Sequence, residues 1–521
     1  MKSSIGILVA SALCVVCGAP RPARAQPMPP NPTVRASGPT GADNNADLGD
    51  ETPVEPRNVP QVNNTVKEAY TPQPGGLTAD QVAARAVATS DSIAAKNAQL
   101  RAAAAEVDSA LYGFFPKATL KASYTRLSRV NVGLGDGYSV GAGTPGPLTV
   151  GPNGEVQDSA GNPVGAASFS FPAIVNNYSL SASLSVPLSD YVLRLSNSIA
   201  ATKRNREASE LNAKAERQKV QGDARIAFFN WARSIGQVAV TEKSIERVRA
   251  RLKDAHAAFT VGNVTRAEVL RLEAQVATTE AGLESARAFR ELAAQQLAVI
   301  MDDQQANYRL GEDVLAETVP PPRRSLGELV ADAQRQRFEL MALDQGVESL
   351  RRGERVIRAG RLPRLDGFAD YTYANPNQRY FFDPTWHGTW SAGVQLSWTI
   401  NDVLVNGKSG DQMAAQRAEL EANRKALAEG IRMEVTSAYT DARRAAAALE
   451  AAKRAAEASQ AAYDTSVQLY RVGKATTAEL IDAEADLVSS LLGLINAHID
   501  TRVAATKLAR ATGRDLTHLG Y

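Results

Sequence analysis

The sequence predicts a mainly α-helical fold with long coiled-coil hairpins and four β-strands per chain, the strands forming a candidate membrane β-barrel portion. Three observations lead to this prediction. A succession of helix, two strands and two long helices occurs twice in the 521 residues. The strand segments alternate apolar and polar side chains with a period of two. The long helical segments place small or apolar residues every 3.5 positions, as coiled coils do.

The N-terminus, residues 1–25, has the features of a secretory signal peptide. Lys2 is followed by an apolar run over residues 5–16 and by Ala23-Arg24-Ala25, the pattern of a cleavage site. The only two cysteines, Cys14 and Cys17, fall in or beside that run, and neither follows a small residue, which disfavours a lipoprotein anchor. We therefore expect an exported chain without disulfides.

Charge and motifs exclude several classes of function. Without Lys2, Arg21 and Arg24, the 58 Lys and Arg residues fall to 55, against 56 Asp and Glu, so no nucleic-acid partner is expected. No run of about 18 apolar residues predicts a transmembrane helix. Nucleotide-binding and hydrolase motifs are absent, so neither an enzyme nor a cofactor is expected. No metal site is expected either, because four histidines lie far apart: His256, His387, His498 and His518.

Composition and repetition divide the rest of the chain. Residues 26–76 are rich in Pro and Asn and are expected to be disordered. The first repeat covers residues 77–303, a linker 304–325, the second repeat 326–513 and a short tail 514–521. Each repeat opens with a helical stretch, over 77–114 and 326–362, which ends before a proline.

Two strands follow in each repeat. Their apolar positions alternate with Ser, Thr, Lys, Asp and Gln, although Phe368 interrupts the polar side. Segments of about ten residues with one apolar face suit an outer-membrane barrel, but also a half-buried sheet of a soluble domain. The apolar series are Ala118-Leu120-Ala122-Tyr124, Leu180-Ala182-Leu184-Val186-Leu188, Leu365-Gly367-Ala369-Tyr371-Tyr373 and Trp390-Ala392-Val394-Leu396-Trp398-Ile400.

Long helices complete each repeat, and both break at a repeated motif. A helix over residues 195–259 would extend roughly 100 Å at ~1.5 Å per residue. Helices over 266–301 and 478–513 are expected to return from the breaks. The breaks read FTVGNVTRAEVLRLEA from Phe259 and YRVGKATTAELIDAEA from Tyr470, 211 positions later. Gly262 and Gly473 suit a helix C-terminus, and Thr265 and Thr476 suit the N-cap of the returning helix.

The whole pattern resembles the outer membrane efflux protein family of the TolC type. The resemblance covers residues 77–513 and rests on the order and doubling of its motifs. These motifs are Leu77-Thr78, Phe114-Phe115-Pro116-Lys117, Leu184-Ser185-Val186-Pro187-Leu188 and the two Val-Gly-x-x-Thr breaks.

The resemblance implies a homotrimeric exit duct in the Gram-negative outer membrane. Three chains would contribute four strands each to a twelve-stranded barrel, continuous with an α-helical tunnel across the periplasm. A periplasmic adaptor and an inner-membrane transporter would be partners, with outer-membrane lipid around the barrel. The duct would be passive, for a tripartite efflux pump or a type I secretion system. A periplasmic coiled-coil adaptor or scaffold without a barrel is the alternative, and the cargo stays open.

The resemblance also assigns roles to residues of the two breaks. Adaptor docking falls to Val261, Gly262, Thr265, Val472, Gly473 and Thr476. The pore constriction falls to Glu479 and Asp482, with Tyr470 bonded to Glu268 of a neighbouring tip. Ala475 stands where the family has a gate arginine, which leaves open how a closed gate is held. From the residues alone, both acids could equally be solvated charges at a helix N-terminus.

Overall fold

The computed structural model describes residues 64–128, 140–142, 144, 146–167, 175–315, 320–380 and 383–514. The expected signal peptide, most of the segment expected to be disordered and all but the first residue of the tail lie outside these residues. Within 26–76, the structure places helix α1 (Asn64–Ala69) and a fully buried Tyr70. The ordered fold therefore begins before residue 77, which was the start expected from the sequence.

Each repeat opens with two helices rather than one. In the first repeat α2 (Ala79–Thr89) and α3 (Asp91–Tyr112) are separated by Ser90, whose side chain caps α3. In the second, α7 (Leu326–Gln336) and α8 (Phe338–Ala359) are separated by Arg337. Both opening stretches end before their proline, as predicted, and a strand begins at the residue after it.

Four strands form one antiparallel sheet in the order β1-β6-β7-β8. They are β1 (Lys117–Arg126), β6 (Asn176–Val186), β7 (Arg364–Asn375) and β8 (His387–Ser397). The second and fourth strands end earlier than predicted, because Leu188 begins the short helix α4 (Leu188–Asp190) and Ile400 begins helix α9. The long loop between β1 and β6 carries four short strands, β2 (Val140–Ala142), β3 (Thr149–Val150), β4 (Val156–Gln157) and β5 (Gly165–Ala167).

One face of the four-stranded sheet is apolar from edge to edge. Leu120 of β1 lies opposite Ala182 of β6, which lies opposite Tyr371 of β7, and Tyr371 lies opposite Trp390 of β8. These side chains and their apolar neighbours are largely exposed in the single chain. Strands β1 and β8 stand at the two edges of this sheet, each with one neighbour.

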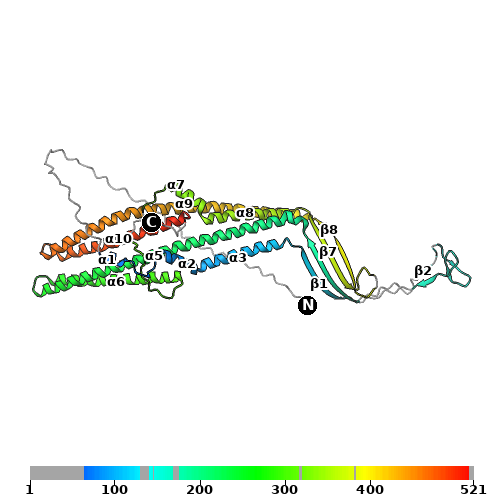
Figure 1. Cartoon of the computed structure of the whole chain (residues 1–521), viewed down its shortest axis with the longest axis horizontal. Coiled ribbons are helices and arrows are strands. Elements are labelled where there is room, and N and C mark those ends of the chain that lie inside the picture. The colour runs from blue at the N-terminus through cyan, green and yellow to red at the C-terminus, as the bar shows by residue number, and fades with distance from the viewer. Residues whose placement is uncertain are drawn as a thin grey trace, which may run out of the picture. The chain divides into compact units, whose positions relative to one another are not determined.

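The long helices form two hairpins that lie beside one another and run away from the sheet (Figure 1). After a π-helical turn η1 (Tyr191–Leu195), α5 (Ser196–Thr260) returns as α6 (Arg266–Met301), and α9 (Ile400–Arg471) returns as α10 (Thr477–Ala511). Within the chain, α10 packs against both α9 and α5. The largest buried cluster, with Phe228, Trp231, Leu297 and Ile495, lies between these helices.

The segment before the first repeat and the linker between repeats bind to this core. Gln73 N–H donates to Leu310 O at 2.8 Å, and Leu77 N–H donates to Arg309 O at 2.8 Å. The Tyr70 hydroxyl donates to Ala232 O at 2.8 Å, beside Gly236, where a Cβ would stand 2.3 Å from that hydroxyl. The absence of a side chain at Gly236 thus makes room for the Tyr70 ring.

Candidate functional site: the tips of the two helical hairpins

Both hairpin tips have the same backbone construction. Gly262 and Gly473 have φ of 79° and 71°, the left-handed region that glycine enters without strain. In each tip the glycine N–H donates to the carbonyl three residues earlier, Phe259 or Tyr470, at 3.0 Å. The next N–H, of Asn263 or Lys474, donates to the backbone carbonyl five residues earlier, at 2.9 or 2.8 Å. The α5 and α9 helices therefore end in the same left-handed cap.

Each returning helix begins with a reciprocal capping box. Glu268 N–H donates to Thr265 Oγ1 at 3.3 Å, and Thr265 N–H donates to the Glu268 carboxylate at 3.1 Å. In the second tip, Glu479 N–H donates to Thr476 Oγ1 at 3.2 Å, and Thr476 N–H donates to the Glu479 carboxylate at 2.7 Å. The predicted N-caps are therefore confirmed, and each glutamate of the motif has a structural partner.

The Glu479 carboxylate is held in its charged form by this box. The Thr476 N–H and the Thr476 hydroxyl both donate to it, and these hydrogen bonds lower the pKa of Glu479 below its usual value. Glu479 and Asp482 are both exposed in the single chain. The structure therefore leaves their side chains accessible to solvent or to another chain.

The remaining residues predicted for the tips lie at their exposed ends. Val261 and Val472 are 68% and 67% exposed, large values for apolar side chains. Thr265 and Thr476 are exposed beside them. Tyr470 and Glu268 are half-buried, and no hydrogen bond joins them within the described residues of one chain.

A buried acid close to the tips was not predicted from the sequence. Glu484 of α10 has a side chain only 3% exposed. Its carboxylate accepts hydrogen bonds from Arg247 Nε at 3.0 Å and from Arg251 Nη1, both on α5. Ser244 Oγ, also on α5, lies 3.4 Å from the same carboxylate. A charged cluster therefore joins the second hairpin to the first.

An aromatic ring from α9 completes the Glu484 cluster. Arg251 also donates to the Tyr463 hydroxyl, and the guanidinium groups of Arg247 and Arg251 lie 5.7 and 5.2 Å from the Tyr463 ring centre. Burial raises the pKa of Tyr463, so its hydroxyl keeps its proton. Two signals in the sequence point to the cluster: the Glu-Ala that ends each repeated motif, and two arginines four residues apart on one helix face.

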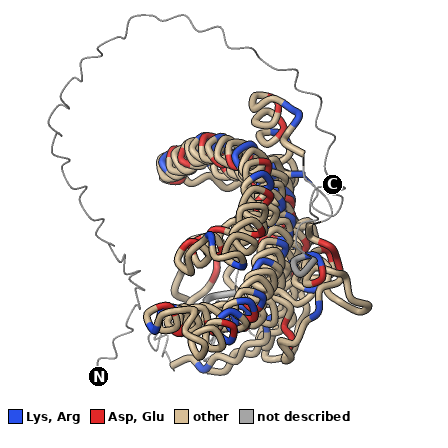
Figure 2. The backbone as a smooth tube through the Cα atoms, turned by 90° about the vertical axis from the view of Figure 1, so that its left-hand side faces the viewer, with Lys and Arg blue, Asp and Glu red and all other residues tan. Residues whose placement is uncertain are grey.

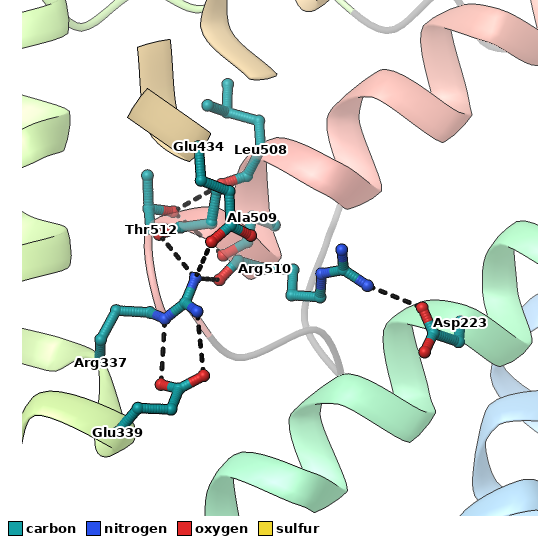
Figure 3. A network of polar contacts seen from close by, with 9 residues as sticks. Asp223, Arg337, Glu339, Glu434, Leu508, Ala509, Arg510 and Thr512 are labelled. Atoms are coloured by element: carbon teal, nitrogen blue, oxygen red, sulfur yellow. Dashed lines mark hydrogen bonds and ion pairs between the residues drawn. The ribbon is translucent and has the colours of Figure 1, made fainter. Parts of the chain in front are cut away.

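A second polar network lies at the other end of α10, where that helix ends (Figure 3). The buried Arg337 donates from Nη1 to the Glu434 carboxylate at 3.1 Å and to the Ala511 carbonyl at 3.3 Å. Its Nε and Nη2 hold both oxygens of Glu339 at 3.0 and 2.9 Å. Beside it, Arg510 donates to Asp223 of α5 at 2.7 Å. The hairpins are thus tied at both ends of α10.

Charge is distributed along the helices rather than gathered in one patch. Figure 2 shows Lys and Arg interspersed with Asp and Glu along the tubes of the hairpins. The described residues contain no cluster of three or more His, Cys, Asp or Glu side chains placed to hold a metal ion. None of the helices that the structure describes combines the length and apolar character required to cross a membrane.

Comparison with known proteins decides the family. The model of the family described as "Outer membrane efflux protein" matches residues 82–301 and 329–514, which is most of the chain.

The chain belongs to the outer membrane efflux protein family.

Two curated relatives and a solved structure agree with this membership. The outer membrane efflux protein BepC of Brucella suis biovar 1 (strain 1330) is 24% identical over 338 residues, 60% of this chain and 69% of BepC. The outer membrane protein TolC of Escherichia coli (strain K12) is 21% identical over 353 residues, 65% of this chain and 70% of TolC. The outer-membrane channel OprN has a similar fold, with a TM-score of 0.68 at 17% identity, over 89% of this chain and 95% of OprN.

These comparisons confirm the family, the fold class and the cellular location predicted from the sequence. The chain is an outer-membrane efflux channel of a Gram-negative cell, with its helical hairpins in the periplasm. The family is one of channels and not a class of enzymes. Its members are trimers that work with adaptors and inner-membrane pumps.

Proposed function

We propose that three copies of this efflux protein close their sheets into one twelve-stranded barrel. The proposal rests on the four-stranded sheet, whose apolar face is exposed and whose edge strands β1 and β8 are ten and eleven residues long. An open sheet edge is not tolerated in lipid, because its N–H and C=O groups would have no partners. Pairing β8 of one copy with β1 of the next satisfies those groups, and three copies supply twelve strands.

The hairpins of the three copies then enclose the exit duct. Glu479 and Asp482 form acidic rings at its periplasmic end, with Tyr470 and Glu268 at the contact between neighbouring tips. Acidic rings at a constriction favour cations over anions. The exposed position of both acids on α10 supports this placement.

The duct takes its cargo from a periplasmic adaptor and an inner-membrane transporter. The adaptor binds the six tips of the trimer through Val261, Gly262, Thr265, Val472, Gly473 and Thr476. The exposed valines offer an apolar contact at the end of each hairpin. The alternative function for this chain is a soluble coiled-coil scaffold. Such a scaffold does not need a sheet with an exposed apolar face.

Fractionation and gel mobility test the trimer. We expect the protein in the outer-membrane fraction, as an oligomer that resists detergent until it is heated. Its mass in detergent should be three times that of one chain. A monomer found only in the soluble periplasmic fraction would reject the barrel.

Single-channel recording tests the constriction. In the double variant Glu479→Ala and Asp482→Ala, the preference for cations should fall sharply, because the fixed negative charge of the rings is lost. The variant Glu429→Ala and Glu457→Ala removes two exposed acids of α9 that lie outside the tip motif and serves as a control for net charge. Equal selectivity in wild type and the double tip variant would place Glu479 and Asp482 elsewhere.

A further inference from the structure

The polar face of the four-stranded sheet carries a large apolar side chain, that of Phe368 on β7. Asp366 and Asp370 stand two residues before and after it on the same face of the strand. On the neighbouring strands, Phe368 lies opposite Ser185 of β6 and Gly393 of β8. In the barrel proposed above, the apolar face of the sheet contacts lipid and the polar face lines the lumen. The Phe368 ring is then part of the channel wall.

Gly393 gives the Phe368 ring its place against this wall. A Cβ at Gly393 would stand 3.1 Å from Phe368 Cζ and 3.2 Å from Phe368 Cε1. The ring therefore extends from β7 across the backbone of β8, where the absence of a side chain makes room for it. Phe368 is half-buried in this position, and no other aromatic ring among the residues that the structure describes packs against it. Part of the ring is thus open to a ligand in the lumen.

Of the two acids beside the ring, Asp370 is the one without a partner. The Asp366 carboxylate accepts a hydrogen bond from Arg364 Nε at 2.9 Å. Asp370 makes no hydrogen bond or ion pair within the described part of the chain, and it lies opposite two neutral residues, Ser183 and Ser391. Positions two apart on a strand are separated by about 6.6 Å, so one ligand can contact both the ring and the Asp370 carboxylate.

The lysines on the same face lie too far away to neutralise Asp370. Lys117 and Lys121 both belong to β1, and β6 separates β1 from β7. In the barrel, β8 likewise separates β7 from β1 of the next copy. Neighbouring strands are about 4.8 Å apart, so the backbone of either β1 lies about 10 Å from that of β7. Salt screens much of the interaction between exposed charges at this separation. The wall beside the ring therefore keeps a negative charge.

An aromatic ring next to an unpaired carboxylate suits one class of ligand. The face of an aromatic ring attracts a cation that comes within about 6 Å of its centre. The carboxylate attracts the same positive charge, and the apolar groups of an organic cation gain from contact with the ring. A small inorganic cation has no apolar groups to bury, and an organic anion is repelled by the carboxylate.

We propose that Phe368 and Asp370 form a binding site for organic cations on the wall of the barrel, with one site in each chain and three in the trimer. The inference rests on the proposed barrel, because only its closure places both side chains in the lumen. The site is distinct from the acids of the hairpin tips, which lie at the other end of the duct and attract cations of every kind.

The first measurement establishes which face of the sheet lines the lumen, in a full-length chain in which Cys14 and Cys17 are replaced by alanine. Ser391→Cys places a thiol on the polar face of β8, opposite Asp370, and Ala392→Cys places one on the apolar face as the matched control. A neutral, membrane-impermeant thiol reagent should modify Ser391→Cys far faster than Ala392→Cys in the assembled trimer. A protein that does not form a trimer, or the reverse order of the two rates, would reject the proposed barrel and this inference with it.

Protection of the Ser391→Cys thiol tests the class of ligand. Benzyltrimethylammonium should slow the modification, because it carries both a ring and a positive charge. Tetramethylammonium has the charge without the ring, and benzenesulfonate has the ring with a negative charge, so at the same concentration both should protect much less. If the trimer forms and the two thiols differ as expected, but the three compounds protect alike, the binding site is rejected and the barrel is not.

Substitutions in the Ser391→Cys chain then identify the residues that bind. Phe368→Leu keeps an apolar side chain without a ring, and Asp370→Asn removes the charge. Each should raise the concentration of benzyltrimethylammonium needed for half-protection about threefold or more. Tyr371→Leu removes a ring from the lipid-facing side of the same strand and should leave that concentration unchanged. Equal values in the Phe368→Leu and Tyr371→Leu variants would show that the Phe368 ring does not contact the ligand.

Discussion

The two hairpin tips share one backbone and differ in what their last glutamate contacts. Glu273 and Glu484 both precede an alanine, eight residues after the N-cap threonine. Glu273 lies at the surface, 3.6 Å from His256, whereas Glu484 is buried between two arginines. The motif therefore fixes the turn, and the residues of the neighbouring helix decide whether the same side chain is solvated or holds two hairpins together.

Replacing these two glutamates with alanine gives the largest contrast that we expect. Glu484→Ala leaves Arg247 and Arg251 without their carboxylate in a largely buried site and should cost about 3 kcal/mol of stability. Glu273→Ala removes an exposed charge and should cost less than about 0.5 kcal/mol. Thermal unfolding followed by helical circular dichroism in detergent measures both, and similar costs would show that burial of Glu484 has no energetic weight.

The C-terminal ends of the returning helices offer a second contrast. Arg337 donates to the carbonyls at the end of α10 from a buried position, and Arg85 donates to Met301 O at the end of α6 from a half-exposed one. Arg337→Ala also leaves Glu339 and Glu434 without a partner, so we expect a loss of about 2 kcal/mol, against about 0.5 kcal/mol for Arg85→Ala. The same unfolding measurement ranks the two, and a reversed order would contradict the role given to Arg337.

Substitution of the two tip glycines should lower the stability of the protein by equal amounts. Both have positive φ and both have open space where a Cβ would stand. Gly262→Ala and Gly473→Ala should therefore each cost about 1 kcal/mol, from backbone strain alone. A clear difference between them in the stability of the assembled trimer would mean that a neighbouring chain crowds one tip.

A fall in pH should destabilise the second hairpin through His498, a titratable side chain that the first hairpin lacks at the corresponding position. Burial, with Lys453 and Arg502 nearby, lowers the pKa of His498 on α10 to about 4, while its counterpart on α6 is Arg287. The unfolded chain binds the proton more readily, so stability should fall as the pH drops from about 6.5 to about 4. His498→Asn should flatten that part of the pH profile of thermal unfolding, and an unchanged profile would exclude His498 as the cause.

Sequence patterns predicted the elements well because each has a local physical cause. The period of two predicted the strands, the prolines at 116 and 363 predicted where the opening helical stretches end, and the glycine and threonine of each motif predicted both tips. The interruptions at Ser90 and Arg337 were missed, since the apolar period continues across them. The end of β6 was placed too late, because Leu188 fits the alternation although the chain turns into a helix there.

The sites were harder to predict than the fold. A glutamate near a helix N-terminus gives the same sequence pattern whether its side chain faces solvent, a pore or an arginine on another helix. Glu484 was overlooked because its partners lie more than 230 residues earlier in the chain. Only the packing of α10 on α5 brings them together.

The exposed edges of the sheet have a consequence for how the protein is made. Before assembly, each chain carries an apolar sheet face and two free strand edges, which are a template for pairing with any other strand. The hairpins, by contrast, have their own buried core within one chain. Folding of the hairpins can therefore precede insertion, and biogenesis must keep the strands apart from one another until the membrane and two further chains are available.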